Sequence, residues 1–282
     1  MKKLKKAISL ILVSGLMGVL LTGCGTSGDS GSKDQGQANK KIKVGFCAGP
    51  YEDMFKKGIE PSLKEKGYTV EYVLFSDYVQ PNNALANKEI DVNLFQHSTY
   101  LNNFKKEHSL DLTDITEVPT AGMGVFSNKI KSVADIPDGA TVAIPNDPTN
   151  LTRALKVLEQ AGLVKIDPTK DSATATEKDL SENSKHLKFS LIEAPQLPRT
   201  LDSTDIAVIN GNYAISAGLK LSEAIFNEQL KDGYINVIAV RTEDKDSQLA
   251  KDLLEIVKSD AFKSVINDPN GEFVSFQKPK DF

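Results

Sequence analysis

The sequence has no tryptophan and only two cysteines, Cys24 and Cys47, among its 282 residues. Two cysteines allow at most one disulfide, so the disulfide framework that stabilises many small secreted domains is excluded. Cys47 ends an apolar stretch, and we expect its side chain to be a small buried hydrophobic group. A nucleophilic role for Cys47 is the alternative.

Motifs of the common catalytic and nucleotide-binding sites are also missing. The chain contains no GxSxG, no HExxH, no CxxC pair and no GxxxxGK[ST]. Its three histidines, His97, His108 and His186, lack the spacing of a metal cluster. We therefore expect a protein that is not an enzyme and that holds neither a metal nor a cofactor.

The chain lacks a surplus of positive charge, with a formal net charge of −4 at pH 7. Four of its lysines, Lys2, Lys3, Lys5 and Lys6, lie before the apolar stretch 7–21, and without them the net charge becomes −8. A nucleic-acid-binding protein would show a basic face. We expect no nucleic-acid partner.

The apolar stretch 7–21 has fifteen residues, whereas a membrane-spanning helix needs about 20. Its length and the lysines before it are typical of a signal peptide. The tetrapeptide Leu21-Thr22-Gly23-Cys24 follows, and it matches the lipobox of bacterial lipoproteins. We expect a signal peptide over 1–23 and a lipid on Cys24 that anchors the protein at the extracytoplasmic face of the cell membrane. An ordinary signal peptide with an incidental cysteine, or a short anchor helix, are the alternatives.

Residues 24–40 predict a flexible tether, because 25–39 contain no large apolar residue and are rich in Gly and Ser. About 240 residues remain after it, which is enough for one large domain or two modest ones.

These remaining residues alternate between strand and helix patterns. We expect strands at 42–46, 69–75, 90–95, 140–144, 187–192, 206–209 and 236–240, an extended segment at 118–126, and helices at 52–66, 81–88, 97–107, after Asp147-Pro148, and from 247. Pro61 should kink or split the first helix. Alternating βα units predict α/β architecture with mostly parallel sheets. We interpret the pattern as two lobes, 41–120 with 236–282 and 121–235.

Polar residues follow several of these strands, at the edge where open α/β sheets bind ligands. In the first lobe they are rings: Tyr78, Phe95, His97 and Tyr100. In the second they are Asn150, Arg153 and Asn210. A ligand with an apolar tail and charged groups would suit a cleft between these two sets.

Each of these residues also has a purely structural interpretation. Arg153 could hold a carboxylate in bidentate fashion, or it could be exposed or form an internal ion pair. Phe95 could be core, and His97 a satisfied structural group. Asn210 could bind an amino or carboxylate group, or it could be a helix N-cap.

Five segments resemble the methionine-binding lipoprotein family (MetQ/NlpA), in order and spacing. They are SDYVQPN at 76–82, IDVNLFQH at 90–97, NKIKSVADIPDGATVAIPNDPTN at 128–150, EAPQLPR at 193–199 and VINGNYAISAGL at 208–219. The resemblance implies a type 2 periplasmic-binding fold, with two lobes joined by two hinge strands. It also implies a monomer that binds methionine and passes it to the permease of an ABC importer.

By this resemblance Tyr78, Phe95 and His97 line the side-chain pocket, with Tyr100 nearby. Arg153 holds the carboxylate, and Asn210 and Asn150 meet the head group. The chain departs from the family at PYEDMF (50–55), at Leu151-Thr152 and at PTAGMGVFS (119–127), near the expected cleft. A methionine-containing dipeptide or another amino acid is therefore an alternative ligand, and an enzyme or an adhesion lipoprotein are more distant alternatives.

Overall fold

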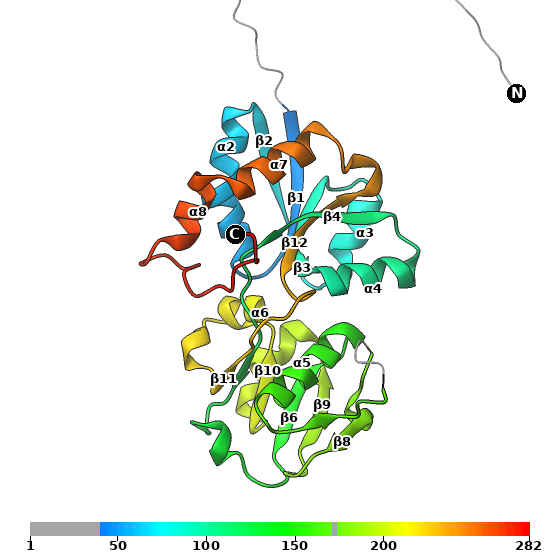
Figure 1. Cartoon of the computed structure of the whole chain (residues 1–282), viewed down its shortest axis with the longest axis vertical. Coiled ribbons are helices and arrows are strands. Elements are labelled where there is room, and N and C mark those ends of the chain that lie inside the picture. The colour runs from blue at the N-terminus through cyan, green and yellow to red at the C-terminus, as the bar shows by residue number, and fades with distance from the viewer. Residues whose placement is uncertain (1–39, 171–173) are drawn as a thin grey trace, which may run out of the picture. The chain divides into compact units, whose positions relative to one another are not determined.

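Two separate five-stranded sheets form the cores of the part of the chain that the structure describes, residues 40–170 and 174–282 (Figure 1). The structure is a computed structural model. The expected signal peptide, Cys24 and most of the tether lie outside the described residues.

The first sheet has the strand order β2-β1-β3-β12-β4. Its strands are β1 (Lys40–Cys47), β2 (Tyr68–Phe75), β3 (Val92–His97), β4 (Leu112–Val118) and β12 (Asn236–Arg241). The helices packed around it are α1 (Tyr51–Met54), α2 (Glu60–Glu65), α3 (Gln80–Ala86), α4 (Ser98–His108), α7 (Gln248–Lys258) and α8 (Asp260–Asn267). We call this unit lobe 1.

The second sheet has the order β11-β5-β10-β6-β9. Its strands are β5 (Gly124–Phe126), β6 (Thr141–Pro145), β9 (Lys188–Ile192), β10 (Ile206–Ile209) and β11 (Phe226–Asn227). The helices α5 (Pro148–Gln160) and α6 (Gly211–Ser216) pack on it, and β7 (Lys165–Ile166) pairs with β8 (Leu180–Glu182) at one side. Short 3-10 turns occupy Val133–Asp135, Glu177–Asp179, Ala194–Asp202 and Leu221–Glu223. We call this unit lobe 2.

The expectation of mostly parallel sheets is right for β1, β2 and β3 and for β6, β9 and β10. It is wrong for β12, which is antiparallel to both β3 and β4, and for β5, which is antiparallel to β10. Both exceptions are the strands by which the chain enters a lobe from the other one. They arrive from the opposite end of the sheet and so run against its central strands.

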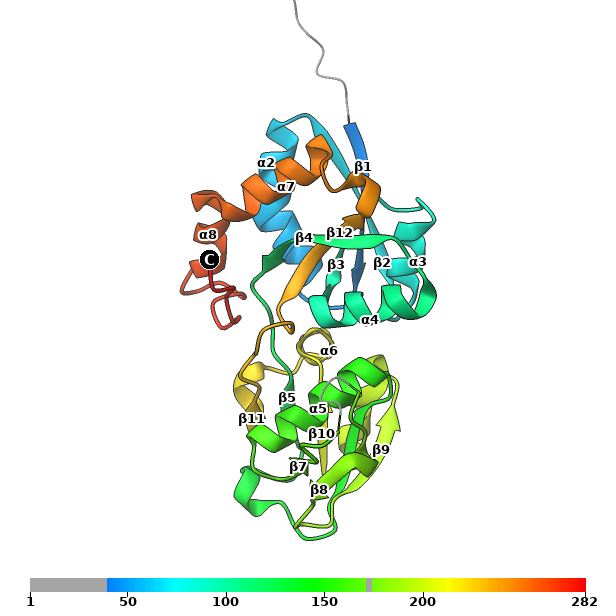
Figure 2. The same cartoon turned by 45° about the vertical axis from the view of Figure 1, so that its right-hand side comes forward.

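The chain crosses between the lobes twice, between β4 and β5 and between β11 and β12. Figures 1 and 2 show the two crossings side by side. The backbone N–H of Asn236 on the second crossing donates to the Thr120 hydroxyl on the first, at 2.8 Å. The C-terminal segment returns to the same place, where Gln277 and Thr120 exchange two backbone hydrogen bonds. The two crossings and the chain end are thus joined to each other.

The helix that contains Pro61 is divided, as expected. A π-helical turn, Phe55–Ile59, separates α1 from α2, and Pro61 is the second residue of α2. Proline has no N–H for the helical ladder and its ring crowds the preceding carbonyl. A wider turn before Pro61 accommodates both effects.

Candidate functional site

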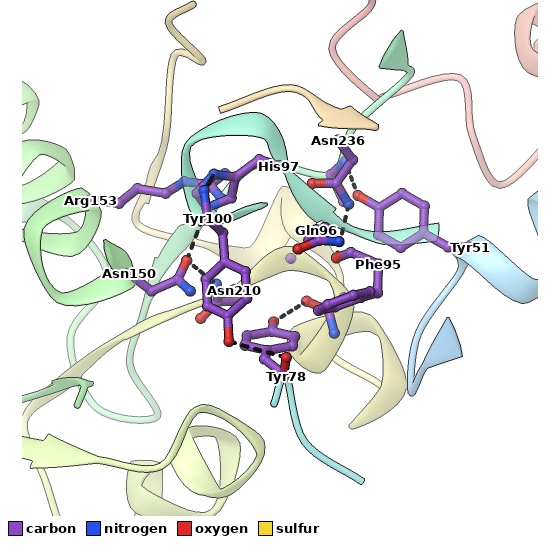
Figure 3. Close-up of a pocket in the computed structure, with 13 residues that line it drawn as sticks. Tyr51, Tyr78, Phe95, Gln96, His97, Tyr100, Asn150, Arg153, Asn210 and Asn236 are labelled. Atoms are coloured by element: carbon purple, nitrogen blue, oxygen red, sulfur yellow. Dashed lines mark hydrogen bonds between the residues drawn. The ribbon is translucent and has the colours of Figure 1, made fainter. Parts of the chain in front are cut away.

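A narrow pocket lies between the two lobes (Figure 3). Its cavity has a volume of about 20 Å³. The lining residues are Tyr51, Tyr78, Phe95, Gln96, His97, Tyr100, Ala121, Asn150, Arg153, Asn210, Gly211, Asn212 and Asn236.

All seven residues that the sequence suggested as ligand contacts line this pocket. Phe95 and His97 end β3, Tyr100 lies in the first turn of α4, and Tyr78 is in the loop after β2. Asn150 and Arg153 lie in the first turns of α5, and Asn210 directly follows β10. The rule that ligands bind beyond the carboxyl ends of strands therefore identified residues of both lobes that the fold places in one pocket.

Lobe 1 contributes an aromatic wall. The rings of Tyr78 and Phe95 are 5.8 Å apart, and each lies about 6 Å from the ring of Tyr100. The Tyr100 hydroxyl donates to the Tyr78 carbonyl at 3.1 Å, which holds the two rings together. Such a wall suits an apolar or sulfur-containing group.

His97 has both a structural role and a place at the pocket. Its Nδ1 accepts from the Tyr100 N–H at 3.2 Å and so caps α4. The proton is therefore on Nε2, which donates to Asn150 Oδ1 at 3.4 Å. Burial, together with the nearby positive charge of Arg153, holds the pKa of His97 well below its usual 6.5. His97 is thus a neutral donor at pH 7.

Lobe 2 contributes polar groups. Asp147 caps α5 and Pro148 is its first residue, as the sequence predicted. The Asp147 carboxylate accepts from the backbone and the side chain of Asn150, and burial raises the pKa of Asp147. The amide of Asn150 is held in this way at the edge of the pocket.

Asn210 is the N-cap residue of α6 by position, but its side chain makes no capping bond. Its Nδ2 donates to Asn150 Oδ1 at 2.9 Å. Its Oδ1 is buried and has no hydrogen-bond partner among the described residues. Buried acceptors without a partner are rare and costly, so this oxygen is a place for a donor from a ligand.

Arg153 lines the pocket and also forms the internal ion pair that its alternative interpretation described. Its Nε and one Nη donate to the two carboxylate oxygens of Glu228, at 2.9 and 2.7 Å, and both residues are buried. Burial alone would lower the pKa of Arg153, but the charge and hydrogen bonds of Glu228 raise it. The guanidinium has five N–H donors, so donors remain for a carboxylate.

The structure adds residues that sequence reasoning missed. Tyr51 comes from α1 and its hydroxyl accepts from the Ala121 N–H at 3.2 Å. Asn212 joins the lobes, because it accepts from the Tyr78 hydroxyl at 2.6 Å and donates to the Ala48 carbonyl at 2.8 Å. Asn236 begins β12. The departure from the family at 50–55 was a signal for Tyr51, whereas no sequence pattern marked Asn236 or Glu228.

Gln96, also unforeseen, belongs to a buried amide network. Its side chain exchanges hydrogen bonds with Asn82 at 2.7 and 2.8 Å and donates to Asn93 at 3.0 Å. These three buried side chains satisfy each other's hydrogen bonds, so their role is structural, and this accounts for the amides within the segments 76–82 and 90–97. Cys47 is buried, as expected, and its thiol donates to the Asp77 carbonyl.

Two α/β lobes joined by two crossings, with a pocket between them, define the class of binding proteins with the type 2 periplasmic-binding fold. Solved structures with sequence similarity share this fold. One is a nutrient binding protein from Burkholderia cenocepacia bound to methionine, with 40% identity, a TM-score of 0.76, and 80% of this chain and 95% of that chain covered. Another is a putative methionine-binding lipoprotein from Bacillus subtilis, with 36% identity, a TM-score of 0.79, and 85% and 99% covered.

Among curated relatives, the D-methionine-binding lipoprotein MetQ of Salmonella typhi is 38% identical over 261 residues, which cover 90% of this chain and 92% of that protein. The family model described as NlpA lipoprotein matches residues 42–276. The chain belongs to the NlpA lipoprotein family.

Proposed function

We propose that the protein is an extracytoplasmic solute-binding lipoprotein that captures methionine between its lobes and delivers it to the permease of an ABC importer. Binding, and not catalysis, is its activity. The names of the relatives support this proposal, because the Burkholderia cenocepacia protein is described as bound to methionine and the Salmonella typhi protein as binding D-methionine.

One observation in the site carries the proposal. A narrow pocket has an aromatic wall on one side and, on the other, the guanidinium of Arg153 and the unpaired oxygen Asn210 Oδ1. The aromatic wall of Tyr78, Phe95 and Tyr100, together with His97, would take the thioether side chain. Arg153 would bind the carboxylate, and Asn210 would accept from the ammonium. Asn150 would hold the Asn210 side chain in place through the hydrogen bond between them.

A methionine-containing dipeptide or another amino acid is the second candidate in the same pocket. The small cavity favours one amino acid over a dipeptide, because the lobes already contact each other at its edge, where the Tyr78 hydroxyl donates to Asn212.

Calorimetric titration of residues 40–282 tests the ligand. The panel is L-methionine, D-methionine, norleucine, which lacks the sulfur, and methionine-containing dipeptides. We expect one methionine enantiomer to bind most tightly at a stoichiometry of one. Preference for a dipeptide, or for an amino acid unlike methionine, would overturn the ligand assignment and leave the fold unchanged.

The lipobox and the relatives named as lipoproteins support a location at the extracytoplasmic face of the cell membrane. Within the described residues no helix combines the length and apolar character needed to cross a membrane. We propose that acylated Cys24 anchors a monomer whose lobes are 41–120 with 236–282 and 121–235.

Cys24→Ser tests this anchor. The variant should accumulate as unprocessed precursor, because the thiol that takes the diacylglycerol is gone. Processing and detergent partitioning are compared with those of wild type and of Cys47→Ser, which keeps the lipobox. A Cys24→Ser protein that matures and partitions like wild type would contradict the anchor.

A further inference from the structure

Glu228 does not line the pocket, yet it forms a bidentate ion pair with Arg153, the cation that does. It follows β11 directly, and only 4% of its surface is exposed. Besides the two bonds from Arg153, its Oε2 accepts from the backbone N–H of Met123 at 2.8 Å. Three hydrogen bonds therefore fix this carboxylate in one orientation.

Arg153 is held on a second side as well. The centre of its guanidinium lies 5.2 Å from the centre of the Tyr234 ring, on the second crossing. Glu228 occupies Nε and one Nη, so the remaining Nη hydrogens define the direction in which Arg153 offers a carboxylate its free donors. The geometry of the cation is set before any ligand arrives.

The charges around the pocket almost cancel. Arg153 is the one ionised side chain among the lining residues, and Glu228 neutralises it at contact distance. The next charged groups are of opposite sign: Asp147, the N-cap of α5, accepts from Asn150 at the edge of the pocket, and Lys156 donates to the Tyr234 hydroxyl at 3.2 Å. His97 also faces this region and adds no charge at pH 7.

We propose that Glu228 is a positioning residue that also sets the charge selectivity of the site, so that the cleft takes a zwitterion in preference to a simple carboxylate anion. This inference rests on the proposed function. A buried cation without a counter-charge would favour an anion, because the anion would neutralise it. A cation already paired with Glu228 is best matched by a ligand that has no net charge, whose carboxylate meets Arg153 and whose ammonium meets Asn210 Oδ1.

The test compares ligands that share one side chain. Methionine is the zwitterion, and 4-(methylthio)butanoate has the same thioether and carboxylate but no ammonium. Dissociation constants of both are measured by calorimetry for wild type, Glu228→Gln, Glu228→Asp and the control Glu223→Gln. Glu223 is an exposed acid in the same segment whose nearest cation, Lys220, is 3.9 Å away.

For wild type and for Glu223→Gln we expect methionine to bind at least tenfold more tightly than 4-(methylthio)butanoate, roughly the effect of one charge-assisted hydrogen bond. The anion lacks this bond because it has no ammonium to donate to Asn210. In Glu228→Gln the amide keeps the shape but not the charge, so methionine should weaken while the anion weakens less or gains. The ratio of the two constants should fall by about tenfold. Glu228→Asp keeps the charge and should restore the ratio.

Equal weakening of both ligands in Glu228→Gln would leave Glu228 with the positioning role alone and would overturn the charge selectivity. Should Glu228→Gln not fold, a preference of wild type for methionine of less than tenfold still contradicts the inference. If wild type prefers another amino acid, the same comparison uses that amino acid and its deaminated acid. If wild type binds no amino acid, the proposed function and this inference are both wrong. A wild type that binds methionine while Glu228→Gln keeps the wild-type ratio overturns the inference alone.

Discussion

Arg153 serves two partners on our proposal: Glu228, both in the free protein and in the complex, and the ligand carboxylate in the complex. The sequence offered these roles as alternatives, and the donor count of a guanidinium allows both. A substitution at this position therefore acts on stability as well as on affinity.

Arg153→Ala should weaken methionine binding by about 2–5 kcal/mol, the cost of removing one partner of a buried charge pair. It should also lower the free energy of unfolding by about 3–5 kcal/mol, because Glu228 is left buried without its counter-charge. Calorimetry and urea denaturation measure the two effects. Arg199→Ala, which removes an exposed arginine bonded to Gln196, is the control. Unchanged affinity in a folded Arg153→Ala protein would contradict the carboxylate role.

His97 makes stability depend on pH. Its folded pKa lies well below 6.5, so below pH 6.5 the unfolded chain binds a proton that the native state does not. The contribution of His97 to the free energy of unfolding is therefore fully present above pH 6.5. It is lost as the pH decreases below 6.5, by at most about 1.4 kcal/mol per pH unit for one proton. The raised pKa of Asp147 acts in the opposite direction at lower pH.

The comparison of wild type with His97→Asn isolates this effect, because asparagine keeps an acceptor to cap α4. Urea denaturation from pH 7.5 to 5 should give a smaller slope of stability against pH for His97→Asn. Identical slopes would show that His97 titrates normally.

At the scale of elements, the contacts of α6 with the loops after β1 and β2 join the lobes directly. Asn212 bonds to the Tyr78 hydroxyl and the Ala48 carbonyl. The contact is close: a Cβ at Gly49 would lie 2.6 Å from the Cβ of Asn212. These bonds stabilise the closed arrangement independently of a ligand.

Asn212→Ala removes both bonds, each worth about 0.5–1.5 kcal/mol. The closed population without ligand should decrease, and the apparent dissociation constant should rise accordingly. Small-angle scattering of the free protein measures the first effect and calorimetry the second. Asn128→Ala, in lobe 2 away from the pocket, is the control. Weaker binding with unchanged scattering would mean that Asn212 acts only by touching the ligand.

Much of the architecture was predictable from the periodicity of apolar residues. The strand Ile206–Ile209 and the capped start of α5 were predicted to the residue. β4 was missed over most of its length, because this edge strand alternates weakly and carries acidic residues on its exposed face. Pattern alone also did not give the direction of β5 and β12, which depends on where the chain crosses.

The candidate site was predictable where residues follow strand ends and not elsewhere. Tyr51 reaches the pocket from a helix, Asn236 from the start of a strand, and Glu228 acts through Arg153. Each of these positions depends on how the two crossings bring distant segments together, which single-sequence patterns do not encode.

For the whole molecule, the two halves of the site lie on different lobes, so a ligand that contacts both favours the closed state. Methionine should compact residues 40–282 in small-angle scattering. At a hundredfold excess over the dissociation constant it should also stabilise the protein by about 2.7 kcal/mol, seen as a higher melting temperature. Stabilisation without compaction would mean binding to one lobe or to a form already closed.

The order of strands in the first sheet also has a consequence for folding. Lobe 2 is one continuous stretch of chain, whereas β12 inserts between β3 and β4 after lobe 2 has been made. The part of lobe 1 that precedes lobe 2 can pair β1, β2 and β3, but β4 has its partner only once β12 arrives. Closing this long loop is slow compared with local pairing. In pulsed hydrogen exchange during refolding, the amides of β6 and β10 should therefore gain protection before those of β4, and the pocket forms last.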